Sequence, residues 1–181
     1  LSKHGRINEG IVKEREKIEF LRQRADYIID TSNLLTRELK QEIEKIFVEG
    51  KQYNNIIVTV MSFGFKYGSS READIVFDVR CLPNPFYIEE LKYHTGTESC
   101  VSDYVMQFEQ SQKLLEKLED LIDFLIPLYR HEGKTQLVIA FGCTGGKHRS
   151  VTFAEKMYKH LCDKDIKCRI CHRDINKGKQ N

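Results

Sequence analysis

Hydrophobic and polar positions follow a helical period before residue 50. Apolar side chains recur every three or four residues through 1–24 and again through 35–47, which places them on one face of a helix. Between these two predicted helices, residues 25–30 (A-D-Y-I-I-D) have the composition of a short strand. A single strand leaves its hydrogen-bonding edges unsatisfied, so we expect 1–50 to be the last part of a larger domain whose sheet begins outside this chain.

After a polar linker at 50–55, short apolar runs alternate with helical repeats. The pattern predicts strands at 56–63, 73–79, 137–141 and 166–170, and helices at 101–108, 114–129 and 150–162. Alternating strands and helices indicate parallel crossover units, so residues 55–181 are predicted to form an α/β domain with a mostly parallel sheet. The leucine stripe of the long helix is interpreted as core packing; it consists of Leu114, Leu118, Leu121, Leu125 and Leu128.

The stretch 136–150 (Q-L-V-I-A-F-G-C-T-G-G-K-H-R-S) carries the strongest candidate chemistry. An apolar strand ends in a loop containing Gly145 and Gly146, and Ser150 opens a helical repeat. Backbone N–H groups in such a loop converge on one point, where the helix dipole adds positive charge. With Lys147 and Arg149 on the same turn, the loop is predicted to bind a phosphate-like anion.

The loop shares part of its spacing with two known kinds of phosphate-binding loop. A Walker A loop is excluded, because Gly142 and the Gly146-Lys147 pair are one residue closer together than that motif requires. His148 also stands where the motif has the hydroxyl that binds magnesium. The spacing from Cys143 to Arg149 and Ser150 does match the loop of cysteine-dependent phosphatases. A thiol at a helix N-terminus beside cations favours the thiolate, so a phosphatase with Cys143 as nucleophile and Arg149 as phosphate clamp is the alternative function.

Parallel strands place the loops that follow them at one edge of the sheet, where open α/β sheets bind ligands. The polar residues of this chain gather in those loops. The predicted anion-binding residues are Arg80, Asn84, Thr144, Gly145, Gly146, Lys147, His148 and Arg149, with Lys66, His172 and Arg173 in neighbouring loops.

The charge of the chain is unevenly distributed. The net charge is +2, but residues 55–142 hold 8 Lys/Arg against 13 Asp/Glu, and residues 143–181 hold 10 against 4. The net +6 of the C-terminal stretch suggests a polyanionic partner there. No run approaches the length of a membrane span, and no signal peptide is visible, so we expect a cytoplasmic protein with no membrane partner whose six cysteines are reduced.

The cysteines and histidines give no convincing metal or haem pattern. Residues 168–172 (C-R-I-C-H) match the spacing of haem attachment, and Cys162 would extend them to a three-Cys, one-His set, but no second C-x-x-C pair supports zinc. Cys81 and Cys100 are interpreted as packing residues, and His94 lies in a polar loop without a ligand pattern. No resident metal and no catalytic residue are therefore predicted.

Five motifs together resemble the RapZ/YvcJ family of bacterial nucleotide-binding proteins, whose enterobacterial branch includes an RNase adapter. They are L-S-K-H-G-R-I at 1–7, A-D-Y-I-I-D-T-S at 25–32, D-V-R-C-L-P-N-P at 78–85, G-C-T-G-G-K-H-R-S at 142–150 and H-R-D-I at 172–175. The resemblance implies the end of a P-loop, kinase-like domain at 1–50 and a phosphofructokinase-like sugar-phosphate lobe at 55–181. The whole protein is then expected to bind and hydrolyse ATP or GTP with magnesium, in a part that this chain lacks.

The resemblance also implies a regulatory function for the C-terminal domain. Thr144, Gly145, His148 and Arg149 match the family's sugar-phosphate loop, and the basic positions Lys167, Lys177 and Lys179 lie near those that bind RNA, with Arg173 in the same basic end. The implied partners are a phosphorylated metabolite, RNA, a ribonuclease and further copies of the chain. Phe86 replaces a histidine of the enterobacterial branch, so the metabolite here need not be the amino-sugar phosphate which that branch senses.

Overall fold

A computed structural model describes residues 7–47 and 56–177. The chain divides into two compact units, Leu1–Tyr53 and Asn54–Asn181. The linker predicted at 50–55 lies outside the described residues. Among the described residues, no helix combines the length and the apolar character that crossing a bilayer requires.

The first unit contains two helices, α1 (Ile7–Arg24) and α2 (Thr36–Phe47). The Glu38 carboxylate accepts a hydrogen bond from the Leu35 N–H at 2.8 Å, which satisfies a free donor at the start of α2. The strand predicted at 25–30 is wrong, because this segment forms no strand in the structure. No neighbouring strand of this unit is available to pair with it among the described residues, and an extended segment becomes a strand only when it is paired.

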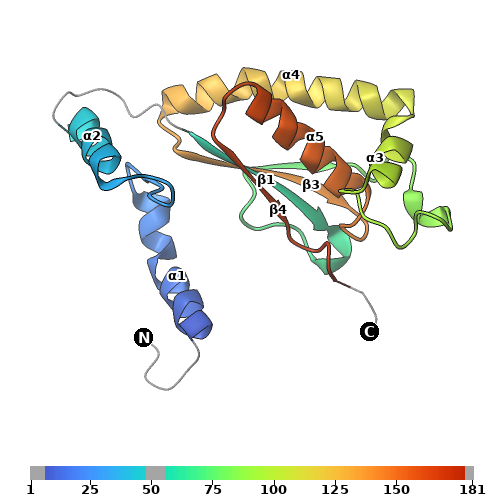
Figure 1. The fold of residues 1–181 in the computed structure, drawn as a ribbon, viewed down its shortest axis with the longest axis horizontal. Helices are drawn as coiled ribbons and strands as arrows, with labels where there is room; N and C mark the ends of the chain where they lie inside the picture. The colour runs from blue at the N-terminus through green and yellow to red at the C-terminus, as the bar shows by residue number, and fades with distance from the viewer. Residues whose placement is uncertain (1–6, 48–55, 178–181) are drawn as a thin grey trace. The chain divides into compact units, whose positions relative to one another are not determined.

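The second unit is an α/β fold built on a four-stranded, fully parallel sheet in the order β2-β3-β1-β4 (Figure 1). Its strands are β1 (Ile57–Gly64), β2 (Ile75–Asp78), β3 (Gln136–Cys143) and β4 (Cys168–His172). Its α-helices are α3 (Ser99–Met106), α4 (Glu109–Glu132) and α5 (Arg149–Asp163), and single 3-10 turns lie at Phe65–Tyr67 and Pro85–Tyr87. The predicted fold class is confirmed, with β4 two residues later than predicted.

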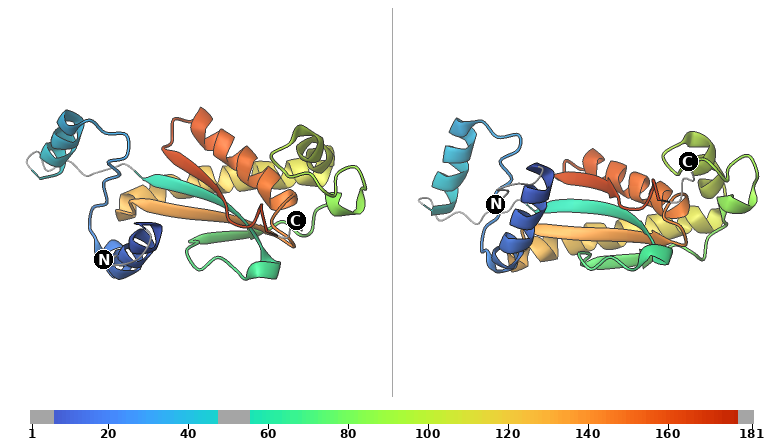
Figure 2. Two further views of the ribbon diagram at one scale, coloured as in Figure 1. Left: turned by 60° about the horizontal axis from the view of Figure 1, so that its bottom comes forward. Right: turned by 90° about the horizontal axis from the view of Figure 1, so that it is seen from below.

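The main core lies between the sheet and the three α-helices. Alternate residues of the strands, such as Val58, Val60, Ile139 and Phe141, belong to one buried cluster with residues of α4 and α5, as the period of a strand requires. Figure 2 shows these two helices beside the sheet. A smaller cluster around Met61 and Phe63 lies on the opposite face, against the segment after β1.

The long helix α4 buries only part of the predicted leucine stripe. Leu118 is buried and Leu114 packs against the core, whereas Leu121 and Leu128 are 41% and 52% exposed. The buried face continues through Ile122 and Ile126, so the leucine spacing located the helix correctly but its buried face only in part. The helix ends at Gly133, whose φ of 93° lies in the left-handed region that glycine adopts without a steric cost.

Candidate functional site

The loops after all four strands meet at the carboxyl edge of the sheet, where the polar residues of the chain were expected to gather. Backbone hydrogen bonds hold them together: Lys66 N to Thr144 O (3.1 Å), Val79 N to Gly142 O (2.9 Å) and Arg173 N to Ser62 O (3.0 Å). The loop after β3 lies in the middle of this arrangement, because β3 pairs with both β1 and β2. Ligands of open α/β sheets bind at such an edge.

The two adjacent glycines of the central loop have different environments. Gly146 has a φ of 73°, and a Cβ there would lie 2.6 Å from the Gly64 nitrogen, so only glycine fits between the loop and β1. A Cβ on Gly145 would meet no atom within 4 Å. Gly146 therefore fixes the loop against the sheet, and Gly145 borders open space next to the start of α5.

Arg149, the first residue of α5, is only 4% exposed. Its guanidinium donates to the carbonyl oxygens of Arg80 (2.8 Å) and Leu82 (3.0 Å) and more weakly to the Thr144 hydroxyl at 3.4 Å. Its Nε–H has no partner in the structure, and no carboxylate lies within ion-pair distance of it among the described residues. The charge of Arg149 contributes to the lowered pKa of the nearby Asp78, but that carboxylate is already paired with Arg80, so a further anion beside the buried guanidinium is still favourable.

His148, immediately before α5, is 7% exposed. Burial lowers the pKa of His148, and the positive charges of Lys147 and Arg149 lower it further. Hydrogen bonds with the backbone of Lys92 and of His94 raise this pKa, but the net pKa is lowered. The imidazole is therefore neutral at pH 7 and can donate one hydrogen bond and accept one. Its Nε2 is buried without a partner in the structure. Two side chains with unpartnered nitrogens thus flank the beginning of α5.

Two further predicted anion ligands, Arg80 and Asn84, have structural partners. The Arg80 guanidinium donates to both oxygens of Asp78 at 2.6–3.0 Å and lies 4.1 Å above the Phe65 ring. These hydrogen bonds hold the pKa of Asp78 below its usual value against the opposing effect of burial. Asn84 caps the turn at Pro85–Tyr87 through Phe86 N–H, at 3.4 Å. Arg80 remains half-exposed, so an anion can still reach it, but Asn84 is first a turn residue.

Asp174 forms a buried connection that the sequence did not reveal. Its fully buried carboxylate accepts hydrogen bonds from Gly64 N–H (2.8 Å) and from Arg173 (2.7 and 3.0 Å), and Lys177 Nζ lies 2.8 Å away. Burial raises its pKa, but the hydrogen bonds from Arg173 and Gly64 outweigh this effect, and the net pKa is lowered. Asp174 therefore ties the segment after β4 to the end of β1.

The predicted RNA-binding residues do not form one surface. Lys167 is exposed and precedes β4, whereas Arg173 and Lys177 follow it. Five strand residues at about 3.3 Å each separate the two ends of β4 by about 17 Å. Lys167 therefore lies at the opposite edge of the sheet from Arg173 and Lys177. Lys179 lies outside the described residues.

Cys143 has the environment of a packing residue. It is 3% exposed, its sulfur lies 3.1 Å from the Ser150 hydroxyl, and it accepts a hydrogen bond from Gly146 N–H at 3.3 Å. An attacking thiolate must reach a substrate, and Arg149 already donates to backbone carbonyls. Neither residue is arranged as the phosphatase alternative requires.

Two of the remaining cysteines differ from their sequence interpretation. Cys81 and Cys100 are exposed, so their assignment as packing residues is wrong. Cys162 lies 3.2 Å from Cys168, but Cys171 is three residues further along β4 and thus on the opposite face of the strand. The C-R-I-C-H stretch therefore does not bring its two thiols together.

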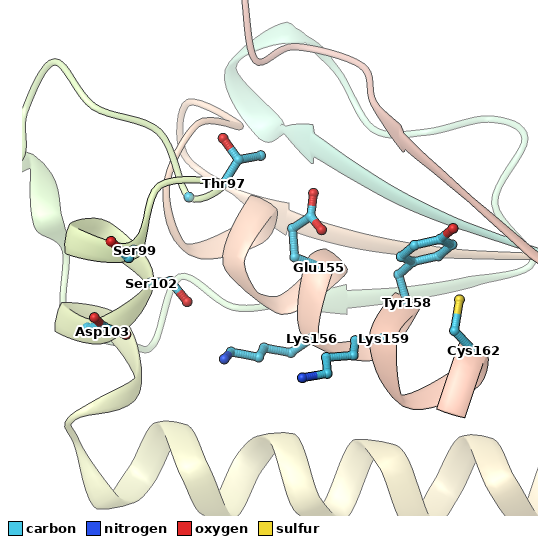
Figure 3. A pocket seen from close by; sticks show the side chains of 10 residues that line it. Thr97, Ser99, Ser102, Asp103, Glu155, Lys156, Tyr158, Lys159 and Cys162 are labelled. Carbon is cyan, nitrogen blue, oxygen red and sulfur yellow. The ribbon is translucent and has the colours of Figure 1, made fainter. Parts of the chain in front are cut away.

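A polar groove of about 550 Å³ between α3 and α5 was not anticipated from the sequence (Figure 3). Ser99, Ser102 and Asp103 line one side, and Lys156 and Lys159 of α5 line the other. The residues of α3 and those of α5 are more than fifty positions apart in the sequence, and they belong to no shared motif. The groove is lined by Asp103 and Glu155 as well as by the two lysines, and those lysines offer a comparison for the cations of the glycine loop.

Comparison with known proteins matches both units to one family. Residues 56–176 match the RapZ C-terminal domain, and residues 1–52 match the RapZ-like N-terminal domain. A nucleotide-binding protein of Agathobacter rectalis is 58% identical over 95% of this chain and 60% of its own length. Nucleotide-binding proteins of Acetivibrio thermocellus and Caldanaerobacter subterraneus are 53% and 55% identical over 100% and 97% of this chain, respectively, and 62% of their own length. The chain thus spans about 60% of the length of these curated relatives.

Proposed function

The chain belongs to the RapZ-like family of nucleotide-binding proteins, and on that basis we propose that its C-terminal unit is a regulatory domain that binds a phosphate-bearing metabolite and RNA. The metabolite binds at the loop between β3 and α5, and the RNA at the basic segment after β4. The whole protein, in the same proposal, binds and hydrolyses ATP or GTP with magnesium in a part outside this chain. Its proposed partners are a ribonuclease and further copies of itself.

The observation that carries the metabolite site is the buried guanidinium of Arg149, which has no carboxylate as a hydrogen-bond partner among the described residues, beside the open space at Gly145. The guanidinium is 4% exposed and has only neutral oxygens as partners among the described residues. The N-terminus of α5 adds partial positive charge at the same place, and its first N–H groups are available to a ligand. Phosphate oxygens are acceptors with negative charge and suit both groups.

The nearby residues allow this site to be tested without unfolding the loop. Arg149 is a poor choice for substitution, because its removal would also release the carbonyls of Arg80 and Leu82. Lys147 is half-buried, and Gly145 faces open space. We therefore expect Lys147→Ala and Gly145→Ala to keep the fold, the first removing a charge and the second placing a methyl group where the ligand would lie.

Calorimetric titration with inorganic phosphate and with an amino-sugar phosphate tests this proposal. A lost charged hydrogen bond costs about 1.5–3 kcal/mol, so Lys147→Ala should weaken binding roughly ten- to hundredfold. Lys159→Ala, in the groove between α3 and α5, is the matched control and should leave affinity unchanged (Figure 3). If Lys159→Ala abolishes binding while both loop variants bind normally, the metabolite site is in the groove instead.

The RNA proposal rests on Lys177 and Arg173 at the carboxyl edge. The Lys177 side chain is 51% exposed and the Arg173 side chain 27% exposed, while Asp174 between them is fully buried. Each phosphate contact that is lost should reduce the slope of log affinity against log salt by about 0.7–0.9. We expect Lys177→Ala to reduce this slope by one such step for structured and unstructured RNAs alike.

Lys167→Ala tests separately whether the RNA reaches the opposite edge of the sheet. If it reduces the slope as much as Lys177→Ala does, the RNA extends along β4. If neither variant, nor both together with Lys179→Ala, changes the slope, RNA binding at this end of the chain is refuted.

A further inference from the structure

The loop before α3 brings together three side chains that the sequence did not connect. A ring nitrogen of His94, a carboxylate oxygen of Glu98 and the sulfur of Cys100 all lie within 4.8 Å of one another. All three residues are exposed, and none belongs to the glycine loop or to the basic segment after β4. Imidazole, carboxylate and thiolate are the three types of ligand that zinc uses in proteins.

The Glu98 carboxylate is held in a defined orientation. Its Oε1 accepts hydrogen bonds from Thr95 N–H at 2.7 Å and from the Thr95 hydroxyl at 3.1 Å. Its Oε2 lies 2.6 Å from His94 Nδ1. One oxygen is therefore fixed by the backbone, and the other faces the imidazole. Hydrogen bonds to the second oxygen of a carboxylate ligand are the outer-shell support that metal sites use.

The loop that carries these residues is fixed to the rest of the unit. Gly96 N–H donates to the Lys147 carbonyl at 2.8 Å, and a Cβ on Gly96 would lie 2.3 Å from the His148 carbonyl oxygen. On its other side, Glu98 caps α3, and its carbonyl accepts hydrogen bonds from Val101 and Ser102 N–H. Cys100 is in the first turn of that helix, so its position is fixed by the helix backbone.

We propose that His94, Glu98 and Cys100 bind one divalent transition-metal ion of the zinc type. Bonds of about 2.0–2.3 Å in a tetrahedral site place neighbouring ligand atoms roughly 3–4 Å apart, a separation that the observed cluster reaches by side-chain rotation. The ion takes the place of the hydrogen between His94 Nδ1 and Glu98 Oε2, with the imidazole proton on Nε2, and Cys100 binds as the thiolate after releasing its proton to water. Water completes the coordination, since the cluster is exposed. The thiolate and imidazole favour zinc over magnesium or calcium, which prefer oxygen ligands.

Cobalt(II) is the probe for this site, because a cobalt–thiolate bond has a charge-transfer absorption in the near ultraviolet that reports the sulfur ligand directly. The whole chain is titrated with cobalt chloride, and zinc chloride is then added to compete. We expect saturation at one cobalt per chain, the charge-transfer band, and its loss when zinc is added. Cys100→Ser should abolish the band. His94→Ala and Glu98→Gln should each weaken binding by at least the roughly 10–100-fold that loss of an outer-shell contact costs.

Two control variants separate this site from other thiols. Cys81→Ser removes another exposed cysteine, and it should leave both the band and the affinity unchanged. Cys162→Ser removes one of the two thiols that lie 3.2 Å apart, and it should also have no effect. A band that persists in Cys100→Ser, or that disappears in Cys162→Ser, overturns the proposal, as does the absence of saturable binding. None of these outcomes depends on phosphate or RNA binding.

Discussion

Replacing the buried carboxylate of Asp174 should destabilise the second unit more than any substitution of an exposed acidic residue. The variant Asp174→Asn keeps the shape of the side chain but removes its charge. Breaking a buried ion pair costs about 3–5 kcal/mol. Because the partners Arg173 and Lys177 are 27% and 51% exposed, solvent screens part of this energy, and we expect a loss of about 2–3 kcal/mol.

The effect of Asp174→Asn should depend on pH. The pKa of Asp174 is lower in the folded protein than the value of about 3.9 in an unfolded chain, so the charged form stabilises the fold above that value. This stabilisation is lost as the pH falls through the lowered folded pKa. The stability difference between wild type and variant should therefore be constant from about pH 5 to pH 7 and should decrease well below pH 4.

Urea denaturation followed by circular dichroism measures this difference at pH 7 and at about pH 3. Asp163→Asn is the control, because Asp163 is exposed at the end of α5 and its substitution should change stability by about 0.5 kcal/mol or less. A loss in Asp174→Asn no larger than in this control, or one that is the same at both pH values, would refute the interpretation of Asp174 as the buried ionic connection between β1 and the segment after β4.

Three further predictions follow from the same part of the structure. Gly64→Ala should destabilise the protein by about 1–3 kcal/mol in thermal unfolding, because its Cβ would lie 2.6 Å from the Gly145 carbonyl carbon. Gly145→Ala should change stability by no more than about 1 kcal/mol, and equal effects of the two variants would contradict the packing described for the loop. Cys168 should react with iodoacetamide at pH 8 far more slowly than Cys81, and mass spectrometry measures both rates. Burial, with a smaller contribution from Cys162, raises the pKa of Cys168 to about 12, so similar rates would contradict this prediction. Wild type and Cys143→Ser should both fail to hydrolyse an aryl phosphate, because the thiol is 3% exposed, and a wild-type rate that disappears in the variant would restore the phosphatase alternative.

The sequence predicted those features that depend on local periodicity. The apolar runs before Gly64 and Cys143 located β1 and β3, and the alternation with helices predicted that the strands are parallel. The strand expected at 25–30 is absent because it was expected to pair with a sheet outside this chain, and an apolar, β-branched composition does not make a strand without a paired neighbour.

The candidate site was predictable in position but not in detail. The glycine loop was located from its spacing, but the sequence could not show that Arg149 is buried against the carbonyls of Arg80 and Leu82. Nor could it show that Lys167 and Lys177 lie at opposite ends of β4, because both were judged by charge alone. Contacts between residues far apart in the chain decide both questions, and a single sequence does not contain them.

The order of strands in the sheet has a consequence for how the protein is made. β1 is the first strand of the second unit to be synthesised, yet both of its neighbours, β3 and β4, come late, and Ser62 meets His172 across 110 positions of chain. Such distant pairings are slow to form, since a long loop must close first. While the ribosome is still translating residues 136–172, the apolar strand β1 has no partner and remains open to aggregation. We therefore expect newly made chains to depend on chaperones until β4 has left the ribosome.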